Sequence, residues 1–335
     1  MEIFLFTYDC RNNEKGDADM NEDAGRRRIL DLRYPMDHEA LMSILNEFAE
    51  RYSCLSVTVM GQSVLGRSIP MLCLGDPKNE GEARRRILYI GAHHGSEWIT
   101  TSVLLRFVNE YCELFCSDGM AEGIRVKRLA EKRDIYLVPM LNPDGVEYAI
   151  HGVSADNVLH ERVLRMNGGS EDFSHWQANA RGVDLNHNYN AGFAEYKQLE
   201  AANGIDGGPT RFSGESPESE PETAYLCNYL RFCRPFDGAL SLHTQGEEIY
   251  YTSGEVTADN SLTLGKYLAR VTGYTLSKPE GLAAYGGFTD WFIRAFEKPS
   301  FTLECGKGSN PLPISDMPMI YLKLRRALFA FPMVV

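Results

Sequence analysis

Hydrophobic residues recur along this chain with the spacings of helices and strands in alternation. Beginning at Asp37, apolar residues return at intervals of three and four, which predicts an amphipathic helix; they are Leu41, Ile44, Leu45 and Phe48. Short apolar runs predict strands at 57–60, 69–74, 87–90, 135–139, 238–243 and 301–304. Helical spacing returns at 98–115, 218–232, 258–271 and 318–331. The alternation predicts a single α/β domain with a mixed, mainly parallel twisted sheet and helices on both faces.

Three stretches depart from this alternation. Residues 1–36 include a long polar and charged stretch and are expected to form a partly irregular N-terminal arm before a main domain at 37–335. The motif Asn-Pro-Asp-Gly at 142–145 is expected to be a turn. From 151 to about 220 no clear period is visible, so irregular structure is expected. A loop of this length in a compact domain is more often functional than idle.

The composition is that of an ordinary globular protein and narrows the classes of partner. Of 335 residues, 44% are hydrophobic and 24% are charged, which is enough material for a large core. The formal net charge of -12 argues against nucleic-acid and anionic-membrane partners, since both require clustered Lys and Arg. Two basic clusters, at 26–28 and 84–86, are expected to be solvated faces.

The cysteines and the N-terminal residues favour a cytoplasmic protein. None of the eight cysteines stands in a Cys-x-x-Cys pair, which disfavours a metal-thiolate cluster. Residues 1–33 show neither the apolar core nor the cleavage site of a secretory signal. No window approaches the roughly 18 apolar residues of a membrane span. We therefore expect free thiols, a cytoplasmic location and no membrane partner, and the oligomeric state stays open.

Three of the predicted strands end in side chains that bind metals or carry protons. His94 and Glu97 follow one strand, and His243 and Glu304 each end another. The carboxyl ends of parallel strands meet at one edge of such a sheet, where ligands bind. A catalytic zinc ion takes three protein ligands and keeps one open position, and imidazole and carboxylate groups both suit it. His94, Glu97 and His243 therefore predict a catalytic zinc site, which a His-x-x-Glu quartet alone would indicate only weakly.

Five short motifs, in order, resemble those of the zinc carboxypeptidase family, which has the fold of carboxypeptidase A. They are Gly-Ala-His-His-Gly-Ser-Glu-Trp-Ile-Thr at 91–100, Asn-Pro-Asp-Gly at 142–145, Gly-Val-Asp-Leu-Asn at 182–186, Leu-Ser-Leu-His at 240–243 and Phe-Thr-Leu-Glu at 301–304. The resemblance covers about residues 37–335, identifies this region as a catalytic domain and implies a zinc metallopeptidase.

The resemblance implies a role for each matching residue. The ligands of one zinc ion per chain would be His94, Glu97 and His243, with water at the fourth position. Glu304 would be the general base that takes a proton from that water and returns it to the leaving amine. Asp184 would accept the second ring proton of the first histidine. Asn186 would hydrogen-bond a carboxylate or an amide of the substrate.

The chain departs from a digestive carboxypeptidase at the groups that bind the substrate. His187 follows Asn186 where those enzymes have an arginine, and histidine binds a carboxylate by charge only when it is protonated. The residue before Asp290 is Thr289, where the enzymes that cut after basic residues have an acid. Asp290 itself is interpreted as either a helix cap or a pocket residue.

Two further groups of the family have no clear counterpart. For the oxyanion-stabilising arginine, the register from Asp184 gives Gln177, with Arg165 and Arg181 as nearby alternatives. A glutamine amide donates a hydrogen bond to an oxyanion, but without charge. For the mobile tyrosine, Tyr285 is either a stand-in or a loop aromatic packed on the domain.

Several other candidate residues are interpreted as structural. His93 would face the opposite side of an extended chain from its neighbour in the zinc motif. Cys305 is expected to pack inward as an inert thiol. Surface positions are expected for His151, His160 and His175.

The segments 176–186, 286–293 and 304–313 most resemble one bacterial branch of the family, the γ-D-glutamyl-L-diamino acid endopeptidase I type. This implies cleavage between γ-D-glutamate and meso-diaminopimelate or lysine, with a peptide or muropeptide derived from peptidoglycan as the substrate. With no secretory signal seen, it implies recycling of imported muropeptides. A general carboxypeptidase and a zinc-retaining binding protein without activity stay open as alternatives.

Overall fold

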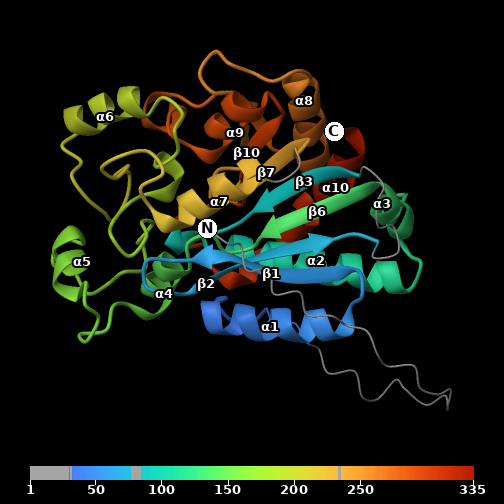
Figure 1. Ribbon diagram of the computed structural model, residues 1–335, viewed down its shortest axis with the longest axis horizontal. Coiled ribbons are helices and arrows are strands. Elements are labelled where there is room, and N and C mark those ends of the chain that lie inside the picture. Colours follow the sequence, from blue (N-terminus) through green and yellow to red (C-terminus); the bar gives the residue numbers. More distant parts are fainter. Residues whose placement is uncertain (1–29, 31, 77–83, 233–234) are drawn as a thin grey trace.

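An eight-stranded sheet organises the computed structural model (Figure 1). The structure describes residues 30, 32–76, 84–232 and 235–335, so most of the predicted arm and the basic cluster at 26–28 lie outside the described residues. The strands, in spatial order, are β1 (Leu55–Gln62), β2 (Ser68–Leu74), β6 (Arg133–Val138), β3 (Arg85–Ile90), β7 (Gly238–His243), β10 (Ser300–Glu304), β8 (Glu248–Tyr250) and β9 (Thr275–Ser277). A separate small ribbon consists of β4 (Met120–Ala121) and β5 (Ile124–Arg125).

The central strands of the large sheet are parallel. β6, β3, β7 and β10 run side by side in one direction, whereas β1 with β2, β2 with β6, and β10 with β8 are antiparallel pairs. Ile90 pairs with Ser241 and Glu304 pairs with His243, so three central strands end at nearly the same level. The predicted mixed, mainly parallel sheet in a single α/β domain is confirmed.

Helices cover both faces of the sheet, as predicted (Figure 1). They are α1 (His38–Arg51), α2 (Ile99–Cys116), α3 (Val126–Lys132), α4 (Pro143–His151), α5 (His160–Met166), α6 (Phe193–Ala202), α7 (Pro221–Phe232), α8 (Ser261–Thr272), α9 (Phe288–Phe296) and α10 (Met317–Val334). Side chains of α1, α2, α8 and α10 form one core with the sheet, and side chains of α7 and α9 form a second core with it. The site at the strand ends therefore rests on a sheet that is packed from both sides.

The first helix shows how the hydrophobic pattern becomes structure. Asp37 caps α1, because its Oδ1 accepts a hydrogen bond from the amide of Ala40 at 2.9 Å. The buried residues of this helix are the four apolar positions of the predicted stripe, Leu41, Ile44, Leu45 and Phe48. Full burial of such a side chain stabilises the fold by about 1.5–3 kcal/mol. The predicted start and inward face of α1 are confirmed.

Two predictions about local structure are wrong. The motif at 142–145 begins a helix and is not a turn: Asn142 Oδ1 accepts from the amide of Gly145 at 2.9 Å, and Pro143 occupies the first turn of α4, where its missing N–H costs nothing. The stretch from 151 to about 220, expected to be irregular, contains the helices α5 and α6, and neither has a side-chain cap. Helix α6 begins after Gly192 in a left-handed conformation (φ 68°) and buries Tyr196 and Glu200, so it has neither a cap nor a hydrophobic stripe that the sequence could reveal.

Residues 151–220, here called the loop wall, are held by a core of their own. Trp176 is fully buried at its centre, with ring centroids 5.6 Å from Phe173 and 6.0 Å from Tyr148 of α4. Figure 1 shows this segment, with α5 and α6, on the side of the sheet to which the arrowheads of β3 and β6 point. The predicted long loop is thus an ordered wall beside the carboxyl ends of the strands.

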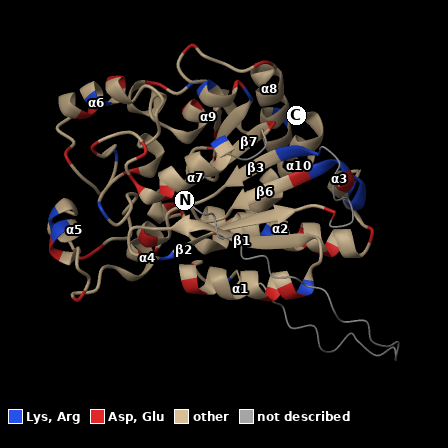
Figure 2. Ribbon diagram, in the orientation of Figure 1, with Lys and Arg blue, Asp and Glu red and all other residues tan. Residues whose placement is uncertain are grey.

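Charged residues lie mainly on the helices and loops, and within the central strands β3 and β6 they lie at the start of each strand (Figure 2). In the basic cluster at 84–86, Arg84 Nε lies 3.1 Å from Asp134 Oδ1, and the guanidinium of Arg86 lies over the ring of Tyr136. These two arginines therefore contact their own domain. Among the described residues, no helix is long and apolar enough to span a membrane.

Candidate metal centre

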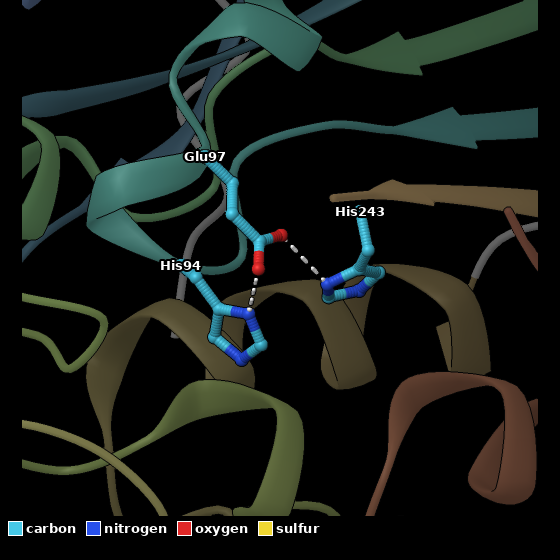
Figure 3. Close-up of side chains that lie close together, drawn as sticks. All are labelled: His94, Glu97 and His243. Carbon is cyan, nitrogen blue, oxygen red and sulfur yellow. Dashed lines mark hydrogen bonds and ion pairs between the residues drawn. The ribbon is translucent and has the colours of Figure 1, made fainter. Parts of the chain in front are cut away.

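The level ends of three parallel strands bring the predicted metal ligands together. β3 leads into a short 3-10 helix, η1 (Gly95–Glu97), which carries Glu97 and is preceded by His94. His243 is the last residue of β7, and Glu304 is the last residue of β10 beside it. Figure 3 shows the side chain of Glu97 directed between the rings of the two histidines.

Both imidazoles present the same nitrogen to Glu97. His94 Nδ1 lies 2.8 Å from Glu97 Oε1, and His243 Nδ1 lies 3.0 Å from Glu97 Oε2 (Figure 3). The potential ligand atoms of the three residues all lie within 4.8 Å of one another. Two imidazole nitrogens and a carboxylate at one buried point are the donor set of a catalytic zinc site. The residues present therefore fit a zinc ion.

The surroundings keep Glu97 ionised. Burial alone would raise the pKa of Glu97, but the charges and hydrogen bonds of His94 and His243 outweigh it and lower the pKa to about 2. The backbone amide of Thr244 and the side-chain amide of Asn310 also donate to this carboxylate, at 3.2 and 3.4 Å. Glu97 is thus an anion with its lone pairs already directed.

Glu304 has the opposite electrostatic environment. Burial and the nearby charge of Glu97 raise the pKa of Glu304 to about 8. A divalent cation bound at this edge acts in the opposite direction and favours the carboxylate form that a general base needs. The surroundings of Glu97 and Glu304 therefore shift the pKa values of these two carboxylates in opposite directions.

Asp184 connects the metal centre to the loop wall. Its Oδ1 lies 3.0 Å from His94 Nε2, the position required to accept the second ring proton of that histidine. Its Oδ2 accepts from the backbone amide of Arg211 at 2.9 Å, and its Oδ1 also accepts from the amide of Asn186. Asp184 begins the 3-10 helix η2 (Leu185–His187), which positions Asn186 and His187.

His93 lies behind the metal centre and away from Glu97. Its Nε2 lies 3.0 Å from the hydroxyl of Tyr189, and its ring stacks on His243 with centroids 5.1 Å apart. Burial is the main cause that holds the pKa of His93 well below its usual range. His93 is fully buried and supports the ring of His243.

A cavity opens beside the metal centre and extends to α9. It is lined by His94, Asn186, His187, Tyr250, Thr252, Pro279, Ala283, Gly287, Thr289, Asp290, Thr302 and Glu304. These residues come from the sheet edge, from η2, from the segments 250–252 and 279–287, and from the first turn of α9. The cavity joins the metal centre to the pocket residues.

A sequence model of the zinc carboxypeptidase family matches residues 41–323 of this chain. The chain belongs to this family. It is 33% identical to γ-D-glutamyl-L-diamino acid endopeptidase 1 of Lysinibacillus sphaericus, over 88% of this chain and 71% of that protein. It is 27% identical to human carboxypeptidase B, over 76% of this chain and 58% of that protein. The structure of carboxypeptidase A from Helicoverpa armigera shares its fold, with a TM-score of 0.67 and 19% identity over 90% of this chain and 73% of that chain.

Membership of the zinc carboxypeptidase family identifies the protein as a zinc metallopeptidase. The family uses zinc, and His94, Glu97 and His243 form a group that could hold it. The predicted enzyme class and cofactor are confirmed. The alternative of a binding protein without activity has no support from these relatives.

At the position of the family's carboxylate-binding arginine, His187 is held as a neutral ring. Its Nδ1 donates to the backbone oxygen of Tyr285 at 3.0 Å, and the ring stacks on Tyr196 with centroids 4.2 Å apart. Burial is the first cause that lowers the pKa of His187, and the charge of Asp184 opposes it only in part. A neutral imidazole whose Nδ1–H is engaged offers an acceptor, and not a positive charge, to a substrate.

The counterparts considered for the other family residues lie outside the cavity lining. Gln177 Oε1 accepts from the hydroxyl of Thr210, and the Gln177 backbone oxygen accepts from the amide of Gly95 at 3.0 Å. Tyr285 packs on Gly192 so closely that a Cβ there would lie 2.7 Å from the tyrosine Cδ1. Of the alternatives to Gln177, Arg181 pairs with Glu220 at 3.5 Å and Arg165 is exposed on α5.

Sequence reasoning missed several residues of the site. Tyr250 and Thr252 line the cavity, but β8 has only three residues and shows no periodicity. Thr302 also lines it, one pleat before Glu304. Asn310 lies in the segment that resembles the endopeptidase branch, and this could have indicated it.

Proposed function

We propose that this member of the zinc carboxypeptidase family hydrolyses the bond between γ-D-glutamate and the diamino acid, meso-diaminopimelate or lysine, in peptides derived from peptidoglycan. Zinc is held by His94, Glu97 and His243, and Glu304 is the general base. Support comes from the relative in L. sphaericus, whose name states this activity and which is 33% identical over 88% of the chain. The geometry of the cavity provides independent support.

The observation that carries the proposal is the lack of a cation for a terminal carboxylate. No Lys or Arg is among the described residues that line the cavity. His187, at the position of the family's arginine, is kept neutral mainly by burial, which lowers its pKa although the charge of Asp184 and the bond to Tyr285 act to raise it. A carboxypeptidase grips the free end of its substrate by charge. An endopeptidase, whose substrate continues beyond the cleaved bond, does not need that grip.

The side chains have distinct tasks in the proposed reaction. Zinc, when bound, supplies a Lewis acid that acidifies a water molecule and polarises the scissile carbonyl. The carboxylate of Glu304 takes a proton from the attacking water and delivers it to the nitrogen of the leaving diamino acid. Asp184 holds the Nε2 proton of His94, so that Nδ1 stays directed at Glu97.

Asn186 is suited to orient the peptide. Its side-chain oxygen accepts from the amide of Phe288 at 3.0 Å, which leaves its NH2 group as the donor toward a carbonyl or carboxylate of the substrate. Asn186 lies in η2 next to His187, on the same side of the cavity. The pair replaces a charged clamp by neutral hydrogen-bonding groups.

The test compares the γ-linked and α-linked forms of the bond between D-glutamate and the diamino acid, and adds a γ-linked peptide without a free C-terminal carboxylate. The zinc-loaded protein is incubated with L-Ala-γ-D-Glu-meso-diaminopimelate, with its α-linked isomer, and with the γ-linked peptide amidated at its C-terminus. We expect release of the diamino acid from both γ-linked peptides, with kcat/KM for the amidated form within a few-fold of the free acid. The general carboxypeptidase alternative requires the reverse: good turnover of ordinary α-linked peptides and loss of cleavage on amidation.

A further inference from the structure

The end of the cavity near α9 contains a buried carboxylate that is only half satisfied. Asp290 is 4% exposed and lies in the first turn of α9, where its Oδ2 accepts from the amide of Gly287 at 3.2 Å. Its Oδ1 is buried and has no hydrogen-bond partner among the described residues. Asp290 is therefore both a helix cap and a cavity residue, the two interpretations that the sequence left open.

A second polar atom at the same end is also without a partner. Thr252 is 1% exposed, lines the cavity, and its hydroxyl has no hydrogen-bond partner within the described part of the chain. A buried polar group left unsatisfied costs about 1–3 kcal/mol, and more when it is charged. Two such atoms on one cavity indicate a place kept for a ligand group.

The groups behind Asp290 do not neutralise it. Arg294 Nε donates to the hydroxyl of Ser253 at 2.7 Å, and Ser253 lies between this arginine and Asp290. Burial raises the pKa of Asp290 to about 7, although Ser253 and the charge of Arg294 act to lower it. The carboxyl group thus lacks a direct counter-ion, and a cation entering the cavity would stabilise its ionised form.

Two threonines of the cavity lining, Thr289 and Thr302, add hydroxyl groups to it. Thr302 Oγ1 donates to Thr289 Oγ1 at 3.0 Å, and Thr289 Oγ1 lies 3.2 Å from Ser300 Oγ. The other carboxyl group of the lining is Glu304, and no Lys or Arg is among the described residues that line the cavity. Hydroxyl oxygens and carboxylates accept hydrogen bonds from an ammonium group, which brings three donors and one positive charge.

We propose that Asp290 Oδ1 and Thr252 Oγ1 bind the side-chain ammonium group of the residue that follows the scissile bond. The inference rests on the proposed function and deepens it, because it states how the enzyme reads the second amino group of a diamino acid. Asp290 recognises the ammonium group, and the preceding Thr289 does not, because the hydroxyl of Thr289 is already hydrogen-bonded to Ser300 and Thr302. An apolar side chain of equal length leaves both buried atoms unsatisfied and is rejected for that reason.

The test uses two substrates that differ only in this ammonium group, L-Ala-γ-D-Glu-L-Lys and the same peptide with L-norleucine. We expect the wild-type enzyme to prefer the lysine peptide by about 10–100-fold in kcat/KM, the range for a buried charged hydrogen bond. Asp290→Asn should lower kcat/KM for the lysine peptide by about 10-fold or more and change the norleucine peptide by less than about 3-fold. Thr252→Val should do the same to a smaller extent, and Thr252→Ser should retain the preference.

Other outcomes overturn the inference. Equal wild-type rates on the two peptides would show that the ammonium group is not read. An equal loss on both peptides in Asp290→Asn, with a lowered melting temperature, would reduce Asp290 to a helix cap, and Thr252→Val, which leaves the cap intact, would then show no change in preference. If no γ-linked peptide is cleaved, the proposed function fails, and the pocket is tested with α-linked peptides that carry lysine or norleucine after the scissile bond. The same contrast between the variants is expected there.

Discussion

The sheet edge and the loop wall meet at the site but hold their residues by different means. At the sheet edge, the hydrogen-bond register of β3, β7 and β10 places the strand ends, with His243 and Glu304, at nearly one level, and His94 follows shortly after the end of β3. In the loop wall, individual contacts place each residue, such as the bond from His187 to the backbone oxygen of Tyr285 and the bonds from the amides of Arg211 and Asn186 to Asp184. The residues of the metal centre are thus positioned by the regular pairing of strands, whereas the residues proposed to bind the substrate are positioned by individual contacts.

The two regions are joined by backbone contacts around η1. The amides of Gly95 and Ser96 donate to the backbone oxygens of Gln177 and Trp176, at 3.0 and 2.8 Å. A Cβ at Gly95 would lie 2.8 Å from the backbone oxygen of Trp176 in the loop wall, so only glycine allows this approach. Because the contact is so close, a change on one side is expected to be measurable on the other.

The largest effect is expected from removing Glu304, the proposed base at the sheet edge. Glu304→Gln keeps the size of the side chain but cannot accept the proton, so kcat should fall by about 10²–10⁴-fold. Zinc content should not change, because Glu304 is not among the three grouped ligands. Glu248→Gln is the matched control, since Glu248 pairs with Glu304 across the strands and does not line the cavity. Retained turnover in Glu304→Gln would assign the base to another residue.

The next largest effect is a loss of stability, expected when the core of the loop wall is disrupted. Trp176→Ala removes the fully buried centre of its core and should lower the free energy of unfolding by about 3–5 kcal/mol, measured in urea. Catalysis should fall as well, because Trp176 contacts η1 through its backbone. The control is Phe48→Ala in α1, which is equally buried but belongs to the core of the sheet and not to that of the loop wall. We expect it to lose stability without loss of kcat/KM in the folded fraction; equal catalytic effects of both variants would contradict the coupling of wall and edge.

Asp184→Asn should produce a smaller change, confined to the link between the two regions. The amide cannot hold the Nε2 proton of His94 as a carboxylate does, so zinc affinity should weaken by about 10–100-fold in a chelator competition. Asp206→Asn, an exposed aspartate of the same wall, serves as the control. Unchanged zinc affinity in Asp184→Asn would limit Asp184 to positioning the loop wall.

The smallest effect is expected on the pH dependence of the unfolding free energy, and it arises where the loop wall meets α7. Burial, together with the charge of Asp144, raises the pKa of Glu222 from 4.5 to about 8. The folded protein then keeps a proton that the unfolded chain releases above its lower pKa, so this contribution to stability falls as pH rises from about 4.5 to about 8. One proton gives a slope of at most about 1.4 kcal/mol per pH unit.

Glu222→Gln should therefore flatten the decline in unfolding free energy between pH 5.5 and 8, measured in urea. The amide of Val64 donates to Glu222 at 3.1 Å, and glutamine can still accept this bond. An exposed acid, Glu215→Gln, should leave the slope as it is. Parallel pH profiles for Glu222→Gln and the wild type would show that Glu222 titrates normally.

The comparison of the two regions also explains what the sequence could predict. His94, Glu97, His243 and Glu304 follow strands that periodicity reveals, and parallel strands bring their ends together. The helix that begins after Asp37 shows the same success in its start and its buried stripe. Where a hydrophobic period exists, the sequence predicts the element and its inward face.

The rest depends on contacts that leave no periodic trace. Thr252 follows a three-residue strand, and α6 begins after an uncapped glycine. The neutral state of His187 results from its burial, and the ring is positioned by stacking on Tyr196 and by its bond to Tyr285, two residues far from each other along the chain. The missing partner of Asp290 is a property of the packed cavity, which no single segment of the sequence contains.

The two oxygens of Asp184 have a consequence for how such an enzyme can change. One oxygen serves a histidine of the metal centre, and the other fastens the chain at Arg211. A lineage that rebuilt its loops to accept a new peptide would have to keep this carboxylate in place or weaken its own cofactor site. A change of substrate preference through these loops is therefore possible only while this one side chain stays in place, because the metal centre depends on it as well.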